Sequence, residues 1–396
     1  MSTVLVKKES AFGATLLISG CCIGAGMIGL PVLSAAAGFL PSTIAMLLAY
    51  FFATGTGLLL LEATLWFDKK VNLLSIAQFA LGKGGKYITW GLFLFLFYSL
   101  FVAYIDGGGQ LITGFLSSFF HYTVPREVGI AVCVGVVGAI TYAGAKAIDH
   151  LNRGLLAGLA LCYCALVALG LAHVEPANLL HVDWKASLAT IPILLLCFGY
   201  QNLVPSLTYY LKKNVGALRY AIMIGNLIPF LIYFLWNFVI LGMITPGNAA
   251  NAGQSDMVAG LLQGASQSLS VQFFVQTFSL FALFTSFIPN ALTFVDFLKD
   301  GLPIKLHRKP LLYGAVLIPP MVFSLFYPNV FLQALGFAGG FVDLLLFGAL
   351  PALVVWIGRY VKKIEGPYTV PGGKLTLSLI FLLSIGFLLF KNFGGT

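Results

Sequence analysis

The sequence predicts an all-α integral membrane protein that forms a single polytopic domain over residues 1–396. Hydrophobic residues make up 59% of the chain and charged residues only 9%, whereas soluble chains carry about 25% charged residues. The apolar stretches reach the ~20 residues of a membrane-spanning helix and exceed the ~10 residues of a membrane β-strand. The Lys and Arg residues lie mostly in short segments between these stretches, so topology explains the net charge of +9 without a nucleic-acid partner.

Eleven stretches are long and apolar enough to cross a bilayer. They lie at about residues 11–36, 40–66, 87–118, 127–144, 149–172, 187–210, 218–244, 270–298, 310–327, 329–357 and 375–392. With a cytoplasmic N-terminus, the inner segments hold all but three of the 22 Lys and Arg residues, which predicts an external C-terminus. Residues 248–268 are too polar to span and are expected to cap the outer face as a short helix.

Two of the spans carry residues that interrupt a helix. The first contains four glycines and a proline within residues 20–31, and the sixth contains Gly199 and Pro205 near its middle. Both residue types disfavour a continuous helix. Because unpaired backbone groups are costly at membrane depth, such a break persists only where it lines an enclosed or watery cavity. The alternative is close helix packing through small residues, which Gly20 and Gly24 would also permit.

The position of the two breaks predicts an internal repeat. The broken spans are the first and the sixth, and each opens a block of five spans. An odd number of spans per block makes the second block run through the membrane in the opposite direction, which is the condition for an inverted-topology repeat. We therefore expect a 5+5 inverted repeat of residues 11–172 and 187–357, with residues 375–392 appended as helix 11, and a binding site between the breaks at mid-membrane.

The backbone groups expected at the two breaks are complementary to a zwitterionic ligand. Free amide groups at a break attract a carboxylate, and free carbonyl groups attract an ammonium group or a cation. Phe101 and Tyr104 share one helix face, and Phe198 and Tyr200 lie at the second break, so these rings would suit an apolar or aromatic substrate side chain. The alternative is that they only fill the bundle, as most of the 35 Phe and 16 Tyr residues must.

Four acidic residues fall within spans, where each is a candidate functional group. Glu62 and Asp296 lie near the cytoplasmic ends and could form an inner gate, or could simply meet water or a basic residue. Asp106, beside three glycines, is a candidate protonatable group, and Asp343 is the fourth candidate, in the second half of the bundle. No H-E-x-x-H or G-x-S-x-G motif and no metal-ligand spacing is present, which argues against an embedded enzyme, a cofactor or a metal but leaves a membrane receptor open.

The chain resembles the hydroxy and aromatic amino acid permease family, in its bacterial tyrosine/tryptophan branch. This family belongs to the amino acid/polyamine/organocation superfamily and has a fold similar to that of the leucine transporter. The matching stretches, in family order, are Ile23-Gly24-Ala25-Gly26-Met27 with Pro31, Leu59-Leu60-Leu61-Glu62, Ala103-Tyr104-Ile105, Asp149 with Asn152-Arg153, Phe198-Gly199 with Val204-Pro205-Ser206, Ile228-Pro229, Thr285-Ser286-Phe287 and Leu325-Phe326-Tyr327-Pro328.

The resemblance implies inward symport of tyrosine or tryptophan by a monomer in the bacterial inner membrane. It implies that Gly24, Ala25 and Gly26 hold the substrate carboxylate and that carbonyls near Cys197 hold its amine. The full set of candidate substrate-binding residues is Cys22, Ile23, Gly24, Ala25, Gly26, Met27, Phe101, Tyr104, Cys197, Phe198, Gly199, Tyr200, Gln201 and Asn202.

The coupling ion stays open between H⁺ and Na⁺. Studied relatives are proton-coupled, and relatives often carry a histidine where this chain has Gln201 and a lysine where it has Leu159. A lysine so placed can substitute for a bound sodium ion, and its absence here leaves sodium coupling open. The candidate ion-coupling residues, which resemble the sodium site of the wider fold, are Gly20, Ile23, Thr285 and Ser286. Within transport, a permease for serine or branched-chain amino acids is the alternative.

Overall fold

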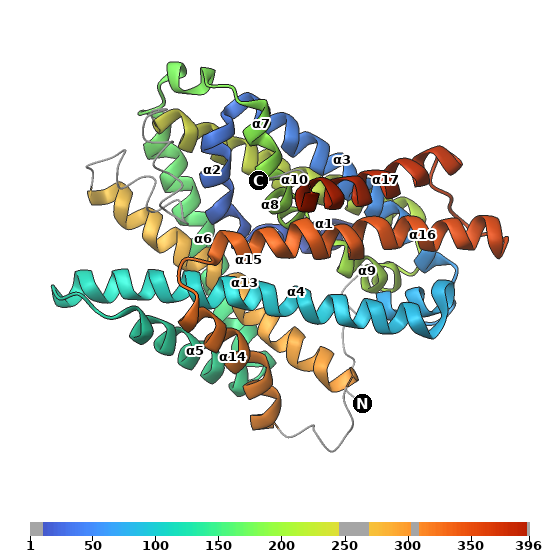
Figure 1. The fold of residues 1–396 in the computed structure, drawn as a ribbon, viewed down its shortest axis with the longest axis horizontal. Coiled ribbons are helices and arrows are strands. Elements are labelled where there is room, and N and C mark those ends of the chain that lie inside the picture. The colour runs from blue at the N-terminus through green and yellow to red at the C-terminus, as the bar shows by residue number, and fades with distance from the viewer. Residues whose placement is uncertain (1–10, 245–268, 302–308, 394–396) are drawn as a thin grey trace, which may run out of the picture.

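The computed structural model describes residues 11–244, 269–301 and 309–393, in which the regular elements are helices joined by short irregular segments, with no strand. Nine of the described helices are long and apolar enough to cross a membrane, and a bent helix pair would make ten. Figure 1 shows α4 (Leu73–Phe120) and the rod of residues 331–361 side by side along the long axis, with other helices crossing them obliquely. The described part of the chain therefore has the architecture of a multi-pass membrane protein. The short helix expected within residues 248–268 lies outside the described residues.

The first half of the chain forms six helices. They are α1 (Ala11–Cys22), α2 (Gly26–Ala37), α3 (Phe39–Leu65), α4 (Leu73–Phe120), α5 (Arg126–Ala143) and α6 (Ala145–Leu171). Gly38 and Gly144 separate neighbouring helices with φ of 88° and 98°, a left-handed conformation that favours glycine. Helix α4 starts earlier than the predicted span because Asn72 caps it, accepting a hydrogen bond from Ser75 N at 2.9 Å, and it kinks at Gly82.

The second half is more interrupted. Its longer helices are α8 (Ile191–Cys197), α9 (Val204–Tyr210), α10 (Val215–Met243), α13 (Leu269–Gly301), α14 (Lys309–Phe326), α15 (Phe331–Phe337), α16 (Leu350–Trp356) and α17 (Gly373–Phe393). Its short or irregular segments are η1 (Pro176–Leu180), α7 (Trp184–Ser187), η2 (Leu188–Thr190), η3 (Gln201–Leu203) and the π-helical segments η6 (Ala338–Ala349) and η7 (Ile357–Val361). From α15 to η7 the backbone forms one continuous apolar rod of 31 residues.

Both predicted breaks are present. Helices α1 and α2 are bent by 59° across residues 23–25, and α8 stops at Cys197 before η3 and α9 resume the span. Gly24 and Gly26 flank the first break, and Gly199 lies in the second. Figure 1 shows that α1 and α2 run in the opposite direction to α8 and α9. The interrupted spans are adjacent, since α2 packs against α8.

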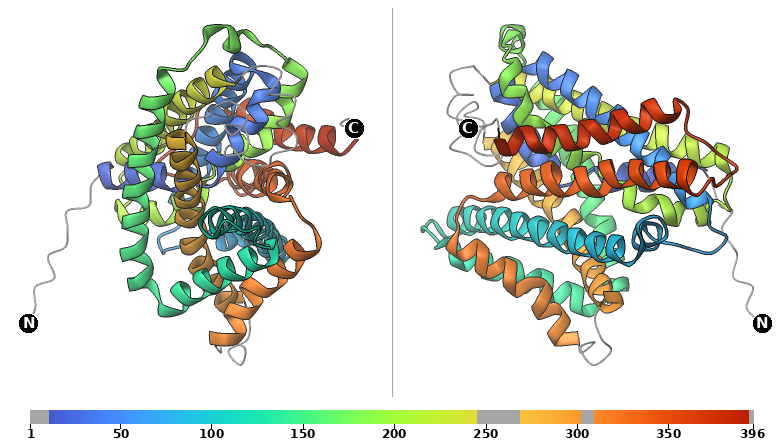
Figure 2. Two further views of the ribbon diagram at one scale, coloured as in Figure 1. Left: turned by 90° about the vertical axis from the view of Figure 1, so that its left-hand side faces the viewer. Right: turned by 45° about the vertical axis from the view of Figure 1, so that its right-hand side comes forward.

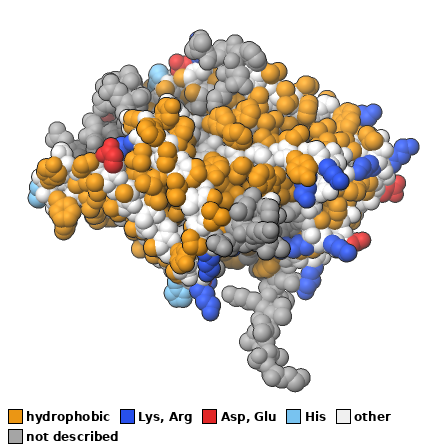
Figure 3. All heavy atoms as spheres, turned by 60° about the horizontal axis from the view of Figure 1, so that its bottom comes forward, with side chains coloured by type: hydrophobic (Ala, Val, Ile, Leu, Met, Phe, Trp, Pro, Cys, Tyr) orange, Lys and Arg blue, Asp and Glu red, His pale blue; other side chains and the backbone are white. Residues whose placement is uncertain are grey.

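The outer surface of the bundle is apolar. Figure 3 shows hydrophobic side chains over most of one face, with Lys and Arg side chains gathered mainly toward one end. Figure 2 shows α17 lying along η6 and α16 at the edge of the bundle. Lys213 with Asp68 and Arg219 over the Tyr368 ring belong to the basic end. This distribution is the one expected of a bundle that lipid surrounds.

Each end of the bundle contains a buried ion pair. At the basic end, both oxygens of Glu62 accept hydrogen bonds from Arg359, at 2.6 and 2.5 Å, and Val370 N donates at 2.7 Å. At the opposite end, Asp106 pairs with Arg126 at 2.5 Å. Glu62 is 1% and Asp106 0% exposed. Glu62 thereby joins α3 to η7, and Asp106 joins α4 to α5 and to the start of α15. Each acid therefore stabilises the packing at its own end of the bundle.

We predict that Arg359→Ala lowers the free energy of unfolding by about 3–5 kcal/mol, because it leaves the buried Glu62 carboxylate without its cation. Thermal unfolding of the protein in detergent would measure the change. The matched control is Lys299→Ala, which opens the exposed 2.8 Å pair with Asp296 and should cost below about 1 kcal/mol. Equal melting temperatures for the two variants would contradict the prediction.

Candidate functional site

Tyr233 of α10 connects the two breaks. Its hydroxyl lies 2.5 Å from the carbonyl oxygen of Cys22, at the end of α1, and 3.3 Å from that of Cys197, at the end of α8. Tyr233 is fully buried. Carbonyl groups at a helix C-terminus lack an intrahelical donor and carry partial negative charge. One hydroxyl donor shared between two such carbonyls holds the interrupted helices at a fixed separation.

Helix α10 also holds the two halves of the first broken span. Trp236 Nε1 donates to Met27 O at 3.1 Å, on the α2 side of the break. Ser19 Oγ donates to Gly225 O at 2.8 Å, on the α1 side. A Cβ atom on Gly225 would lie 2.8 Å from Ile18 Cβ, so the glycine allows the backbones to approach. The bend between α1 and α2 is therefore supported by bonds from one helix to both of its arms.

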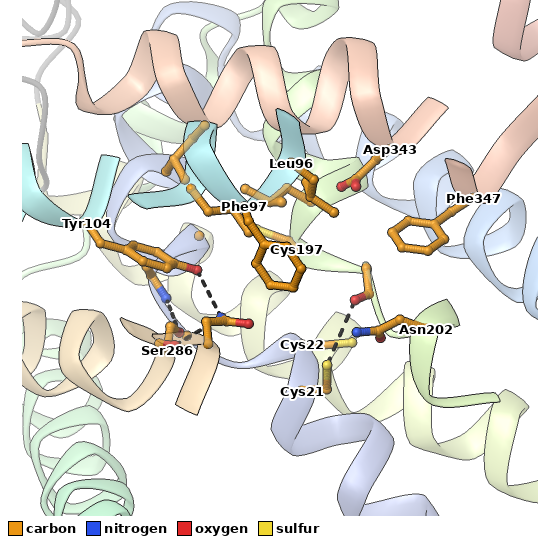
Figure 4. Close-up of a pocket in the computed structure, with 18 of the residues that line it drawn as sticks. Cys21, Cys22, Leu96, Phe97, Tyr104, Cys197, Asn202, Ser286, Asp343 and Phe347 are labelled. Carbon is orange, nitrogen blue, oxygen red and sulfur yellow. Dashed lines mark hydrogen bonds between the residues drawn. The ribbon is translucent and has the colours of Figure 1, made fainter. Parts of the chain in front are cut away.

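A cavity of about 110 Å³ lies between the breaks, and Figure 4 shows the side chains around it. It is formed by α1, α2, α4, α8, α13 and the rod from α15 to η6. Its lining consists of Cys21, Cys22, Gly24, Ala25, Gly26, Phe93, Leu96, Phe97, Leu100, Tyr104, Leu196, Cys197, Gly199, Asn202, Ser286, Asn290, Leu335, Asp343 and Phe347. The structure thus brings both breaks to one central space.

One side of the cavity is polar. The amide of Ala25 donates to Ser286 Oγ at 3.2 Å, and Asn290 Nδ2 donates to Ser286 O at 2.9 Å and toward the Tyr104 hydroxyl at 3.5 Å. A side chain on Gly24 would overlap Ser286 Oγ, and one on Gly26 would come within 2.5 Å of Cys197 Sγ. The glycines therefore allow Ser286 of α13 and Cys197 of α8 to pack directly against the backbone of the first break.

The opposite side is apolar and aromatic. Phe93, Leu96, Phe97 and Leu100 recur every three or four residues along α4 and face the cavity, where Phe347 joins them. This spacing places them on one helix face. Such a surface suits a flat apolar group, because ring contacts and apolar burial both favour it.

The structure places the fourteen predicted substrate-binding residues in two groups. Those that line the cavity are Cys22, Gly24, Ala25, Gly26, Tyr104, Cys197, Gly199 and Asn202. Those that do not are Ile23, Met27, Phe101, Phe198, Tyr200 and Gln201. The second group includes three of the four predicted aromatic residues.

The side chains that lie away from the cavity bond or pack elsewhere. The Tyr200 hydroxyl donates to Ala53 O of α3 at 3.0 Å, and Gln201 Nε2 donates to Thr56 Oγ1 of α3 at 3.3 Å. The Phe198 ring packs against Tyr233. The Phe101 ring packs edge-on against Phe287 at 5.1 Å. The second break thus contributes backbone and Asn202 to the cavity. Its aromatic side chains, Tyr200 and Phe198, instead contact α3 and α10.

The four predicted ion-coupling residues lie at the first break and on α13, and their side chains have different surroundings. Ser286 lines the cavity, whereas Thr285 Oγ1 donates to Ala282 O of its own helix at 3.0 Å. Gly20 is exposed and Ile23 half-exposed. Within the described residues, no hydrogen bond joins Thr285 to Gly20 or Ile23.

The four predicted acids occupy different environments. Glu62 and Asp106 belong to the ion pairs at the ends of the bundle, and Asp296 forms an exposed pair with Lys299. Asp343 lines the cavity and is 4% exposed, and neither carboxylate oxygen has a hydrogen-bond partner among the described residues. Among the four acids, Asp343 is thus the one that faces the cavity.

Sequence reasoning missed several lining residues. Asn290 could have been found, because it follows Ser286 by four residues in an otherwise apolar helix and so shares its face. The stripe of Phe93, Leu96, Phe97 and Leu100 on α4 was also visible as a helical spacing. Tyr233, which bonds both breaks without lining the cavity, gave no signal, since nothing in its local sequence separates it from the other tyrosines.

We predict that Tyr233→Phe lowers the free energy of unfolding by about 1–3 kcal/mol, because two buried carbonyl groups lose their shared donor. Thermal unfolding in detergent would measure it. Tyr220→Phe is the control on the same helix. Tyr220 is 55% exposed, so removal of its hydroxyl should change the free energy of unfolding by less than about 0.5 kcal/mol. An unchanged melting temperature for Tyr233→Phe would show that the hydroxyl does not hold the breaks.

Comparison with known proteins agrees with this architecture. The chain is 30% identical over 384 residues to tyrosine-specific transport system 1 of Haemophilus influenzae, with 94% of each chain covered. It is 30% identical to the tryptophan-specific transport protein of Shigella flexneri, with 97% of this chain and 95% of the relative covered. It is 28% identical to glutamine transporter 2 of Aliivibrio fischeri, with 94% and 97% covered. The model of the tryptophan/tyrosine permease family matches residues 7–391, and the chain belongs to this family of transport proteins.

Proposed function

We propose that the protein is a secondary active transporter that imports aromatic amino acids, tyrosine or tryptophan, by ion-coupled symport. The observation that carries the proposal is the central cavity between the two breaks, with a polar side at the first break and an aromatic side on α4. Family membership and the names of the tyrosine- and tryptophan-specific relatives support it. The substrate would be a zwitterion with a flat apolar side chain.

The two sides of the cavity suggest how such a substrate binds. Its carboxylate would meet the backbone amides of residues 24–26 at the N-terminus of α2, where the field is favourable, and would replace Ser286 Oγ as the acceptor of the Ala25 amide. Ser286 and Asn290 would supply further hydrogen bonds. Its ring would lie against Phe93 and Phe97, and its amine would meet the carbonyl groups near the end of α8. Each part of the substrate then finds a complementary surface within one cavity.

We propose alternating access by relative movement of two bodies. The hydrogen bonds from α10 to α1, α2 and α8 make these helices one body, to which α3 is packed. Helices α4, α5, α6, α13 and α14 pack mainly on one another and form the other body. The cavity lies where the bodies meet. The antiparallel broken spans favour the 5+5 inverted repeat with helix 11, α17, appended.

The same proposal includes a location and an orientation. Lys and Arg side chains gather toward the end that holds the Glu62–Arg359 pair. The positive-inside rule makes this end cytoplasmic, which gives an N-terminus inside and a C-terminus outside the bacterial inner membrane. The transporter would act as a monomer, since both breaks and the cavity come from one chain.

The proposed coupling ion is the proton, with sodium as the alternative. The Ser286 hydroxyl accepts a hydrogen bond from the Ala25 amide, and the Thr285 hydroxyl donates one to Ala282 O in its own helix. A sodium ion would need these two hydroxyls together with the carbonyl groups of Gly20 and Ile23. The buried Asp343 carboxylate in the cavity can carry a proton without any further ligand, and this favours the proton.

We predict that protein reconstituted in liposomes accumulates labelled tyrosine or tryptophan under an inward proton gradient, and does not under a sodium gradient at equal pH. Labelled glutamine, the substrate in one relative's name, is the third probe. Accumulation of glutamine alone would overturn the aromatic substrate. Accumulation driven only by sodium would replace the proton. Stoichiometric binding without any uptake would favour a receptor.

We predict that Gly24→Val abolishes uptake and weakens tyrosine binding at least about tenfold, because the side chain would overlap Ser286 Oγ and cover the amides of the break. Uptake into liposomes and binding in detergent would measure the two effects. Gly91→Val is the control, since no atom lies within 4 Å of a Cβ built there. Normal uptake by Gly24→Val would remove the carboxylate assignment.

A further inference from the structure

Asp343 is an acid without a partner at the centre of the protein. It lies in η6, is 4% exposed and lines the cavity. Both of its oxygens lack a hydrogen-bond partner within the described part of the chain. Figure 4 places its carboxylate between Leu96 and Phe347, across the cavity from Ser286. The other two buried acids, Glu62 and Asp106, each have an arginine and backbone donors.

This contrast indicates what Asp343 does. An ionised carboxylate that is removed from water without a cation or a donor is strongly disfavoured, so the group either accepts a proton or meets a cation. We propose that Asp343 binds the coupling proton, an inference that rests on the proposed proton-coupled import. A proton from external water binds one carboxylate oxygen while the substrate is loaded. The same O–H bond breaks, and the proton returns to water, when the cavity opens to the cytoplasm.

The surroundings of Asp343 favour a proton over a metal ion. The side chains on its side of the cavity are those of Leu96, Leu335, Phe93 and Phe347, which offer no oxygen ligand. A hard metal cation takes about six or more oxygen ligands, whereas a proton needs only the carboxylate itself. Among the described residues, no cluster of three His, Cys, Asp or Glu side chains could hold a metal ion.

Asp343 also touches the element that is expected to move. Gly339, one turn earlier on η6, lies so close to α8 that a side chain there would overlap Pro192 O. A Cβ atom on Gly199, inside the second break, would lie 3.7 Å from Asp343 Oδ2. A change of charge on Asp343 therefore occurs close to the backbone of the break. This proximity gives the proton a way to bias the position of α8.

The other titratable groups near Asp343 do not compete for this role. The elements packed against η6 are α3, α4, α8, α15, α16 and α17. From these and from α1, the titratable side chains that line the cavity are Tyr104, Cys197, Cys21 and Cys22. They are phenol and thiol groups, which are neutral when protonated and ordinarily titrate well above a carboxyl group. The charged groups of the same elements, such as Glu62 and Lys374, do not line the cavity.

The test compares two modes of transport by Asp343→Asn, a variant of equal size that cannot titrate. The first is accumulation of labelled tyrosine or tryptophan under an inward gradient of one pH unit, which supports about a tenfold ratio for one proton per substrate. The second is exchange of internal for external substrate at equal pH. We expect accumulation by Asp343→Asn to fall to a ratio of about one while exchange stays within about twofold of the wild type.

Two control variants test whether the effect is specific to loss of a titratable group at residue 343. Asp68→Asn removes a fully exposed carboxylate and should keep both accumulation and exchange. Asp343→Glu keeps a titratable group and should retain gradient-driven accumulation, at a lower rate because of its extra methylene. Accumulation by Asp343→Asn would overturn the inference. Loss of exchange and of tyrosine binding in monodisperse Asp343→Asn would also overturn it, since Asp343 would then be a ligand of the substrate amine.

A measurement on the wild type keeps the inference testable if Asp343→Asn does not fold. Binding of tyrosine to the solubilised protein in weak buffer should take up one proton per substrate near the pH at which Asp343 titrates, and an indicator dye would record it. No uptake of protons would overturn the inference. If the wild type shows no proton-driven import, the proposed function fails instead. Proton-driven import that survives in Asp343→Asn contradicts only the role of Asp343.

Discussion

The contact between the Tyr233 hydroxyl and the carbonyl groups of Cys22 and Cys197 is the constraint on which the centre of the molecule depends. Two helices end at mid-bundle, and each exposes carbonyl groups that have no partner within its own helix. Two carbonyl ends would repel each other if they approached without a donor between them. One hydroxyl from α10 lies between them, and so the interrupted spans can lie side by side and leave a cavity at their break.

The cavity follows from this arrangement and from the small size of residues 24 and 26. Any side chain at Gly24 or Gly26 would occupy the space next to Ser286 or Cys197. Glycine at both positions lets Ser286 and Cys197 lie directly against the backbone of the first break, and hydrogen-bonding groups gather on that side. The opposite side is apolar because α4 presents Phe93, Phe97 and their neighbours at helical spacing. Polar and aromatic sides facing each other across one space suit an amino acid with a ring.

The buried charges are divided between structural and functional positions. Glu62 and Asp106 are satisfied by arginines and backbone amides at opposite ends of the bundle, where they fix loops and helix ends. Asp343 has no such partner and faces the cavity. An intramembrane acid is costly, and one without a donor is costlier. Its position near the second break places this unpartnered acid next to the helix that moves in the proposed transport cycle.

Composition and periodicity alone determined the membrane class, most of the spans and the two breaks, because lipid requires long apolar helices and glycine and proline interrupt them. The eleventh expected span falls in α17, whose apolar part is shorter than the spans found in the described residues. The chemistry of unpaired backbone groups at a break also made residues 22–26 and 197–202 recognisable as a candidate site. Only the tertiary structure decided which side chains meet there. Phe198, Tyr200 and Gln201 sit beside the break in sequence yet turn to α3 and α10, whereas Asn290, Tyr233 and Asp343 reach it from distant helices. Side-chain direction depends on how neighbouring helices pack around each residue, and local sequence does not contain that information.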